Sequence, residues 1–195
     1  MEKITEKTFI IILLLILASC GQTGKAPVSN YLNYDRDLHK LLEEKGLDAS
    51  KIQIRIDKSD FKLSLIHGES VIKEFPMVLG GNPVDDKLRE GDKCTPEGHF
   101  KVRDMYPHRS WSKFIWIDYP TKESWKKHKA AKAAGKIPDS SHIGGEIGIH
   151  GVPSGRDDLI QKKTNWTLGC ISLSTDDINE IYSVCFKGMD VFIQK

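Results

Sequence analysis

The sequence predicts one mostly β (α+β) domain, built from mixed β-sheet with a few short helices. Apolar and polar residues alternate strictly over residues 52–56, and again over 61–65, as is typical of half-buried strands. Further short apolar segments follow to the C-terminus, whereas helical periodicity is confined to three stretches. At 195 residues the chain is long enough for one sizeable domain and short for two.

The composition is that of an ordinary globular protein. Hydrophobic residues make up 39% of the chain and charged residues 29%, which excludes a disordered polyelectrolyte. The 29 basic and 27 acidic residues nearly cancel, and no Lys/Arg stripe is present. We therefore expect no nucleic-acid partner.

The first twenty residues have the pattern of an export signal. Lys3 and Lys7 precede an uncharged apolar run, residues 9–17, that is shorter than the roughly 20 residues needed to span a bilayer. The sequence Leu-Ala-Ser-Cys at 17–20 resembles the lipobox of bacterial lipoproteins. This predicts a signal peptide over 1–19, lipidation of Cys20 and a membrane-anchored protein facing the periplasm or wall, although a short transmembrane anchor is the alternative reading.

The mature chain is expected to begin with a tether and a short helix. Residues 21–30 are small, polar and aperiodic, hence a flexible tether. Residues 31–45 place Leu38, Leu41 and Leu42 on one helical stripe before Gly46. A catalytic domain is then expected over 51–195, with further strands at 71–79, 99–106, 114–119, 146–150, 169–173 and 190–194.

Two more helices are predicted. Residues 121–135 form a helix with a basic face, interpreted either as a surface helix or as a lid beside the active site. Ser174 is a good N-cap for a helix that ends near Gly188, and its periodicity places Cys185 in the core.

Three cysteines remain after Cys20: Cys94, Cys170 and Cys185. An odd number in an exported protein leaves at least one thiol unpaired within the chain, which is a first sign of a reactive cysteine. No Cys/His spacing suggests a metal site, so none is expected.

Cys170 and His150 are the candidate nucleophile and base. Cys170 opens an apolar segment directly after Gly169, and His150 closes another directly before Gly151. A neighbouring imidazole can lower the pKa of a thiol and act as its general base. The alternatives are a buried core cysteine and a structural histidine.

Two motifs resemble those of the L,D-transpeptidase catalytic domain, often called the YkuD domain. The first is His150-Gly151, followed by sixteen residues counted from Gly151 to Trp166, and then Thr-Leu-Gly-Cys at 167–170. The second, at 89–100, contains Gly-Asp-x-x-Thr-Pro-x-Gly-x-Phe. The resemblance covers roughly 52–195 and implies a sandwich or barrel-like mixed sheet.

The resemblance implies a cysteine-dependent acyltransferase acting on peptidoglycan stem peptides. Cys170 would form a thioester, His150 would act as base, and the carbonyl of Leu168 would orient the imidazole. The amides of Gly169 and Cys170 would supply oxyanion donors. The acceptor would be an amine of a second stem, a protein or a D-amino acid, and neither a metal nor a diffusible cofactor is implied.

Further residues are candidate substrate contacts by the same resemblance. Many family members have His in place of Leu168 and Arg or Asn in place of Ser172, so these two positions leave the specificity open. The full set of candidates is Gly151, Thr167, Ser172, His142 and Trp166. His39, His67, His108 and His128 show no pattern beyond that of surface residues. A Cys94–Cys170 disulfide would inactivate the enzyme and is a possible redox control.

Two other functions compete with transpeptidation. Water could resolve the same thioester, giving an L,D-carboxypeptidase or an amidase that releases stem-attached protein. Alternatively, the domain could be a non-catalytic peptidoglycan-binding lipoprotein that uses the fold as a peptide clamp.

Overall fold

The computed structural model describes residues 31–195. The predicted signal peptide, Cys20 and the predicted tether lie outside the described residues. Within 31–195, no helix combines the length and the apolar character needed to cross a membrane.

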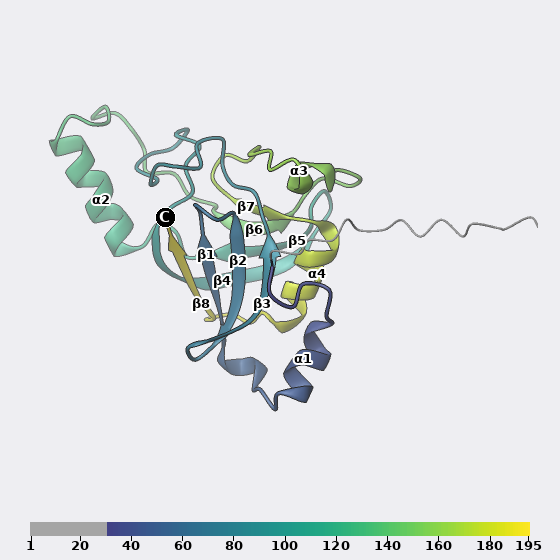
Figure 1. Ribbon diagram of the computed structural model, residues 1–195. Helices are drawn as coiled ribbons and strands as arrows, with labels where there is room; N and C mark the ends of the chain where they lie inside the picture. The colour runs from purple at the N-terminus through teal and green to yellow at the C-terminus, as the bar shows by residue number, and fades with distance from the viewer. Residues whose placement is uncertain (1–30) are drawn as a thin grey trace, which may run out of the picture.

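The eight strands form a single mixed sheet (Figure 1). Their order is β3-β2-β1-β8-β4-β5-β6-β7; the β1–β8 and β6–β7 pairs are parallel and the other pairs are antiparallel. The strands are β1 (Ile52–Asp57), β2 (Lys62–His67), β3 (Ser70–Pro76), β4 (Gly98–His108), β5 (Ser112–Ile117), β6 (Gly148–Gly151), β7 (Ile171–Leu173) and β8 (Asp190–Gln194). The prediction of a mostly β, mixed-sheet domain is confirmed.

The two outer strands almost meet, so the sheet is a nearly closed barrel. Val78, two residues beyond the end of β3, exchanges two 2.9 Å backbone hydrogen bonds with Ser172 of β7. Pro76 has no amide hydrogen and is the last residue of β3, where it removes no bond from a central strand. The closing bridge brings the segment after β3 against the strand that follows Cys170.

The predicted alternation fills the barrel. Ile52, Ile54 and Ile56 of β1 are all buried, whereas the residues between them are half-buried. Leu63 and Leu65 of β2 are fully buried beside them. Burial of these branched side chains contributes roughly 1.5–3 kcal/mol each relative to exposure. The core therefore holds in place the strands that carry the site.

Four α-helices and one short 3₁₀ helix lie around the barrel, with α1 and α2 far apart (Figure 1). The helix predicted over 31–45 is shorter, because the side chain of Asp37 caps the amide of Lys40 and fixes the start of α1 at Leu38. The bounds are α1 (Leu38–Glu44), η1 (Ala49–Lys51), α2 (Lys122–Ala133), α3 (Asp158–Gln161) and α4 (Thr175–Val184). Helix α3 is a single turn and was not predicted from the sequence.

The carboxylate of Glu180 on α4 ties α1 and β3 together. It accepts hydrogen bonds from the amide of Leu38 and from the ammonium of Lys73. The predicted cap of α4 is confirmed, because the Ser174 hydroxyl accepts the amide of Asp177. Cys185, at the C-terminal end of α4, packs against the core as expected. Helix α1 therefore belongs to the same folded unit as the barrel.

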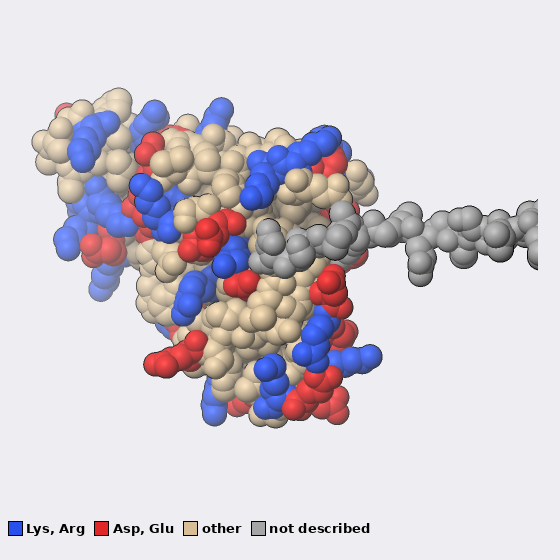
Figure 2. Space-filling model, viewed as in Figure 1, with Lys and Arg blue, Asp and Glu red and all other residues tan. Residues whose placement is uncertain are grey.

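Helix α2 supports the charged loop between β3 and β4. His128 is buried and its Nδ1 lies 2.6 Å from the carbonyl oxygen of Leu88, while Lys127 pairs with Asp86. The expectation that His128 is a surface residue is wrong. Lysine side chains gather over α2 in the space-filling view (Figure 2). No residue of α2 lines the cavity beside Cys170, so of the two readings the surface helix fits the described structure.

Candidate active site

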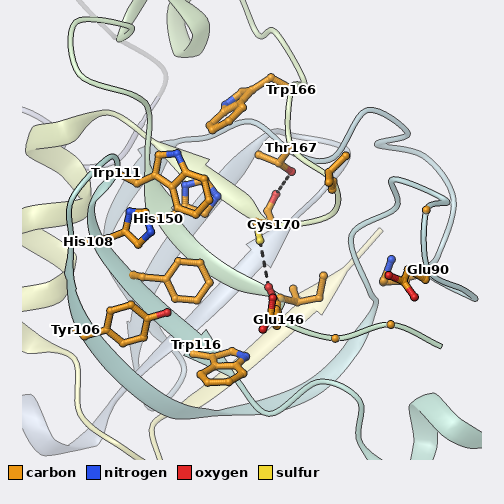
Figure 3. Close-up of a pocket in the computed structure, with 17 residues that line it drawn as sticks. Glu90, Tyr106, His108, Trp111, Trp116, Glu146, His150, Trp166, Thr167 and Cys170 are labelled. Carbon is orange, nitrogen blue, oxygen red and sulfur yellow. Dashed lines mark hydrogen bonds between the residues drawn. The ribbon is translucent and has the colours of Figure 1, made fainter. Parts of the chain in front are cut away.

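Cys170 and His150 line one open cavity of about 1000 Å³ (Figure 3). Aromatic and histidine rings form one side of it, with Tyr106, His108 and Trp116 labelled there, and Glu90 lies on the opposite side of Cys170 (Figure 3). The lining residues are Lys87, Glu90, Gly91, Tyr106, His108, Trp111, Phe114, Trp116, Gly144, Gly145, Glu146, Ile147, His150, Trp166, Thr167, Leu168 and Cys170. The cavity can hold a peptide-sized ligand.

The turn that presents Cys170 is held by Thr167. The Thr167 hydroxyl donates to the carbonyl of Cys170 at 2.7 Å and accepts the amide of Gly169 at 3.2 Å (Figure 3). Gly169 has a φ of +139°, and a Cβ there would lie 2.7 Å from the carbonyl oxygen of Cys94. The residue before Cys170 therefore has to be glycine.

The second sequence motif supports this turn from behind. One carboxylate oxygen of Asp92 accepts the amide of Cys94 and the ammonium of Lys87, and the other accepts the amides of Leu88 and Arg89. Burial alone would raise the pKa of Asp92, but these hydrogen bonds outweigh it and the pKa is lowered. Asp92 thus fixes the loop whose Cys94 carbonyl packs against Gly169.

His150 is held as a neutral base. Its Nδ1 lies 2.8 Å from the carbonyl oxygen of Gly151, which can only accept, so Nδ1 carries the proton and Nε2 is left with its lone pair. The ring stacks on Trp111 at 4.3 Å and meets Trp166 edge-on. Burial lowers the pKa of His150 to about 4, although the Gly151 carbonyl partly opposes this shift.

The Cys170 thiol is also neutral at physiological pH. Burial raises its pKa to about 11. The Gly148 amide and the charge of Lys87 lower the pKa, but by less than burial raises it. Its sulfur lies 3.6 Å from the carbonyl oxygen of Glu146 (Figure 3). Among residues 31–195 no hydrogen bond joins it to His150. His150 is not among the causes of this shift, so a lowering of the thiol pKa by His150 stays a prediction.

The family model for the L,D-transpeptidase catalytic domain, YkuD, matches residues 51–193. The chain belongs to this family. No curated protein matches the chain by sequence.

Solved structures share the L,D-transpeptidase fold. The helical cell shape determining protein Pgp2 from Campylobacter jejuni superposes with a TM-score of 0.53 at 20% identity, over 81% of this chain and 55% of that one. Bd1075 from Bdellovibrio bacteriovorus gives a TM-score of 0.52 at 19% identity, over 74% of this chain and 48% of the other. The chain thus spans about half the length of these two proteins.

Two of the backbone roles implied by the family resemblance are corrected by the geometry. The carbonyl that holds His150 is that of Gly151, not that of Leu168, whose residue is 74% exposed at the cavity mouth. The Gly169 amide already donates to Thr167 and is not free for an oxyanion. The Cys170 amide remains the candidate donor from this turn.

Three of the predicted substrate contacts do not line this cavity. Gly151 is buried against the backbone of Trp111, and Ser172 is fully buried in the barrel wall. The predictions for these two residues are wrong for this structure, because both are enclosed in the wall rather than open to a ligand. His142 is exposed and lines a smaller hollow beside α2 that shares Glu90 and Gly144 with the cavity, so its contact with substrate stays a prediction. Thr167 and Trp166 do line the cavity.

The aromatic side of this cavity was not predicted from the sequence. His108, treated as a surface residue, lines the cavity and stacks on Trp111 at 4.3 Å. Tyr106, Phe114 and Trp116 lie beside them. Five ring-bearing residues between positions 106 and 116 were visible as a local concentration, and this was the signal that could have found them. All three described cysteines are free.

Proposed function

We propose that this chain is a cell-wall acyltransferase in which Cys170 attacks the carbonyl of a peptidoglycan stem peptide. The single observation that carries the proposal is that Cys170 shares one cavity with His150, whose tautomer leaves Nε2 unprotonated. Membership of a family of cysteine-dependent L,D-transpeptidases supports the choice of substrate.

The proton is transferred during attack rather than before it. Both groups are neutral in this structure near pH 7, because the pKa of Cys170 is about 11 and that of His150 about 4. The thiol turns from the Glu146 carbonyl toward Nε2, loses its proton to the imidazole and adds to the carbonyl carbon. The Cys170 amide donates to the developing oxyanion. The imidazolium then protonates the leaving amine, and the thioester remains.

The thioester is resolved by an amine acceptor, which can be another stem, a protein or a D-amino acid. The aromatic side of the cavity favours this outcome, because a bound acceptor covering these rings would displace water from the acyl group. Hydrolysis of the same thioester is the competing outcome and would give tripeptide stems.

The decisive experiment incubates the purified protein with tetrapeptide muropeptides, beside Cys170→Ala. Mass spectrometry should show cross-linked dimers, or exchange of the terminal D-alanine for an added D-amino acid, in the wild type alone. Tripeptides alone would assign a hydrolase. Unchanged substrate in both proteins, together with saturable binding, would assign a peptidoglycan-binding role.

Envelope location agrees with this substrate. The lipid on Cys20 remains a prediction from the sequence. Mass spectrometry of the N-terminal peptide tests it, since a lipidated Cys20 adds the mass of the acyl chains and a Cys20→Ala variant should be released from the membrane fraction.

A further inference from the structure

Three lysines are buried in this domain, and one of them has an unused donor. Lys58 donates to the Asp85 carbonyl, the Thr95 carbonyl and Glu97. Lys73 donates to the Arg36 carbonyl and to both oxygens of Glu180. An ammonium has three N–H donors, so both lysines are saturated.

Lys87 has only two partners among the described residues. It donates to Asp92 Oδ1 at 2.8 Å and to the Arg89 carbonyl at 3.1 Å. Its side chain is 3% exposed, so bulk water does not solvate the third donor freely. An unsatisfied buried donor on a charged group is costly, and the arrangement is stabilised when a ligand supplies the missing acceptor.

Lys87 belongs to the wall of the Cys170 cavity, and its charge acts on the Cys170 thiol. Lys87 is the one cation among the described residues that line it. It is tied to the nucleophile through Asp92, which also holds the amide of Cys94, whose carbonyl packs against Gly169. Glu90 and Glu146 also line the cavity, but both are exposed and their charges are screened by water.

We infer that Lys87 binds the free α-carboxylate of the residue that leaves when Cys170 acylates. This inference rests on the proposed function and adds the residue that would recognise the free carboxylate of the donor stem. That carboxylate is three bonds from the carbonyl carbon, so it must lie close to Cys170 during attack. Sulfur bonds to the carbonyl carbon, the amide C–N bond breaks, and the leaving amine takes the proton from His150. Lys87 keeps its proton throughout.

The test compares a tetrapeptide stem that ends in a free acid with the same peptide ending in a carboxamide. The purified full chain should be acylated more efficiently by the acid, by about 10- to 100-fold in kcat/KM, the range of one hydrogen bond between charged groups. Lys87→Met should lose this preference, so that its acid-to-amide ratio in kcat/KM falls to about one, whatever the loss of its bond to Asp92 does to both peptides alike.

Lys58→Met is the matched control, because it removes a buried ammonium that bonds to the same loop but does not line the cavity. It should keep the full preference for the acid even if it lowers Tm. Lys87→Arg should retain part of the preference, since it keeps a charged donor. If Lys87→Met fails to fold, the wild type still tests whether the cavity prefers a carboxylate, and a reduced acid-to-amide ratio in Lys87→Arg assigns that preference to Lys87.

The outcomes separate the two proposals. Equal acylation of acid and amide by the wild type, or an equal loss for both peptides in Lys87→Met, overturns the carboxylate site and leaves the acyltransferase standing. If mass spectrometry detects no thioester with either peptide, the acyltransferase proposal falls and the carboxylate site falls with it.

Discussion

The Thr167 hydroxyl donates to the carbonyl of Cys170 at 2.7 Å while it accepts the amide of Gly169. The Thr167 side chain thus bonds to the backbone of both Gly169 and Cys170 within the same turn. Thr167 is only 5% exposed, so water cannot easily take the place of its hydroxyl. The turn geometry therefore depends on this hydroxyl rather than on bulk at position 167.

Thr167→Val should lower kcat/KM for acylation by about 10-fold or more and the free energy of unfolding by about 1–3 kcal/mol. Valine has a similar shape, but it leaves the Gly169 amide and the Cys170 carbonyl unpaired in a buried turn. Thr167→Ser keeps the hydroxyl and should stay close to wild type. Acylation kinetics and urea unfolding check both variants, and a valine variant as active as the serine variant would show that the hydroxyl is dispensable.

Alkylation of Cys170 by iodoacetamide should be slow at neutral pH and should rise with pH toward 10. The thiolate is the reactive form, and burial raises the pKa of Cys170 to about 11, above the ordinary value of 9.0. His150→Ala should change this rate little, because the Cys170 sulfur contacts the Glu146 carbonyl and has no hydrogen bond to His150 among residues 31–195, yet it should reduce acylation about 10²- to 10⁴-fold.

Mass spectrometry of the Cys170 peptide at a series of pH values gives the alkylation rates. His108→Ala is the control for acylation, because His108 lines the same cavity and stacks on Trp111 but has no hydrogen bond to Gly151. Its loss should be smaller than that of His150→Ala. A rapid reaction with a midpoint below pH 8, abolished in His150→Ala, would instead demonstrate a thiolate–imidazolium pair.

The fold was predictable because alternation along each strand is a local property. The isoleucines of β1 and the leucines of β2 show it without reference to any other segment. Alternation could not predict the closure of the barrel, since the bridge between Val78 and Ser172 joins segments far apart in sequence, and only the family resemblance implied a barrel-like sheet.

The site was predictable only where a motif names a residue. His150 and Cys170 are brought to one cavity, as their motifs suggested. The motifs did not give the direction of each side chain. Ser172 lies close to Cys170 in sequence, but it is buried in the barrel wall. Lys87 lies outside the quoted motifs, and its position depends on Asp92 and on the packing of the loop.

His150 should make the protein less stable in mild acid. Its pKa is about 4 in the folded chain and near 6.5 when unfolded, so between these values the unfolded chain binds more protons. The contribution to stability is complete above pH 6.5, declines as the pH falls toward 4, and amounts to at most about 3 kcal/mol.

Urea unfolding of wild type and His150→Gln at pH 7 and pH 4.5 measures this contribution. Other groups, such as Asp92, also titrate, so the relevant quantity is the difference between the two proteins at each pH. The variant should lose less stability than wild type on acidification. Equal losses would show that His150 is protonated without cost in the fold.

Gly169→Ala should both destabilise the protein and inactivate it. The backbone is at φ +139°, and the new Cβ would meet the Cys94 carbonyl oxygen at 2.7 Å and the Ile147 Cδ1 atom at 3.1 Å.

Gly155→Ala is the control, because Gly155 also has a positive φ, +76°, but no atom lies within 4 Å of the position of its Cβ. Backbone strain costs on the order of 1–3 kcal/mol at a glycine of positive φ, and it is larger at φ +139° than near the left-handed helical region, so the excess at Gly169 reports this strain together with the clashes with Cys94 and Ile147. Urea unfolding and acylation rates should show a larger loss of stability, and loss of activity, for Gly169→Ala alone. Equal effects would mean that the loop holding Cys94 moves freely, and that Asp92 does not fix the nucleophile turn.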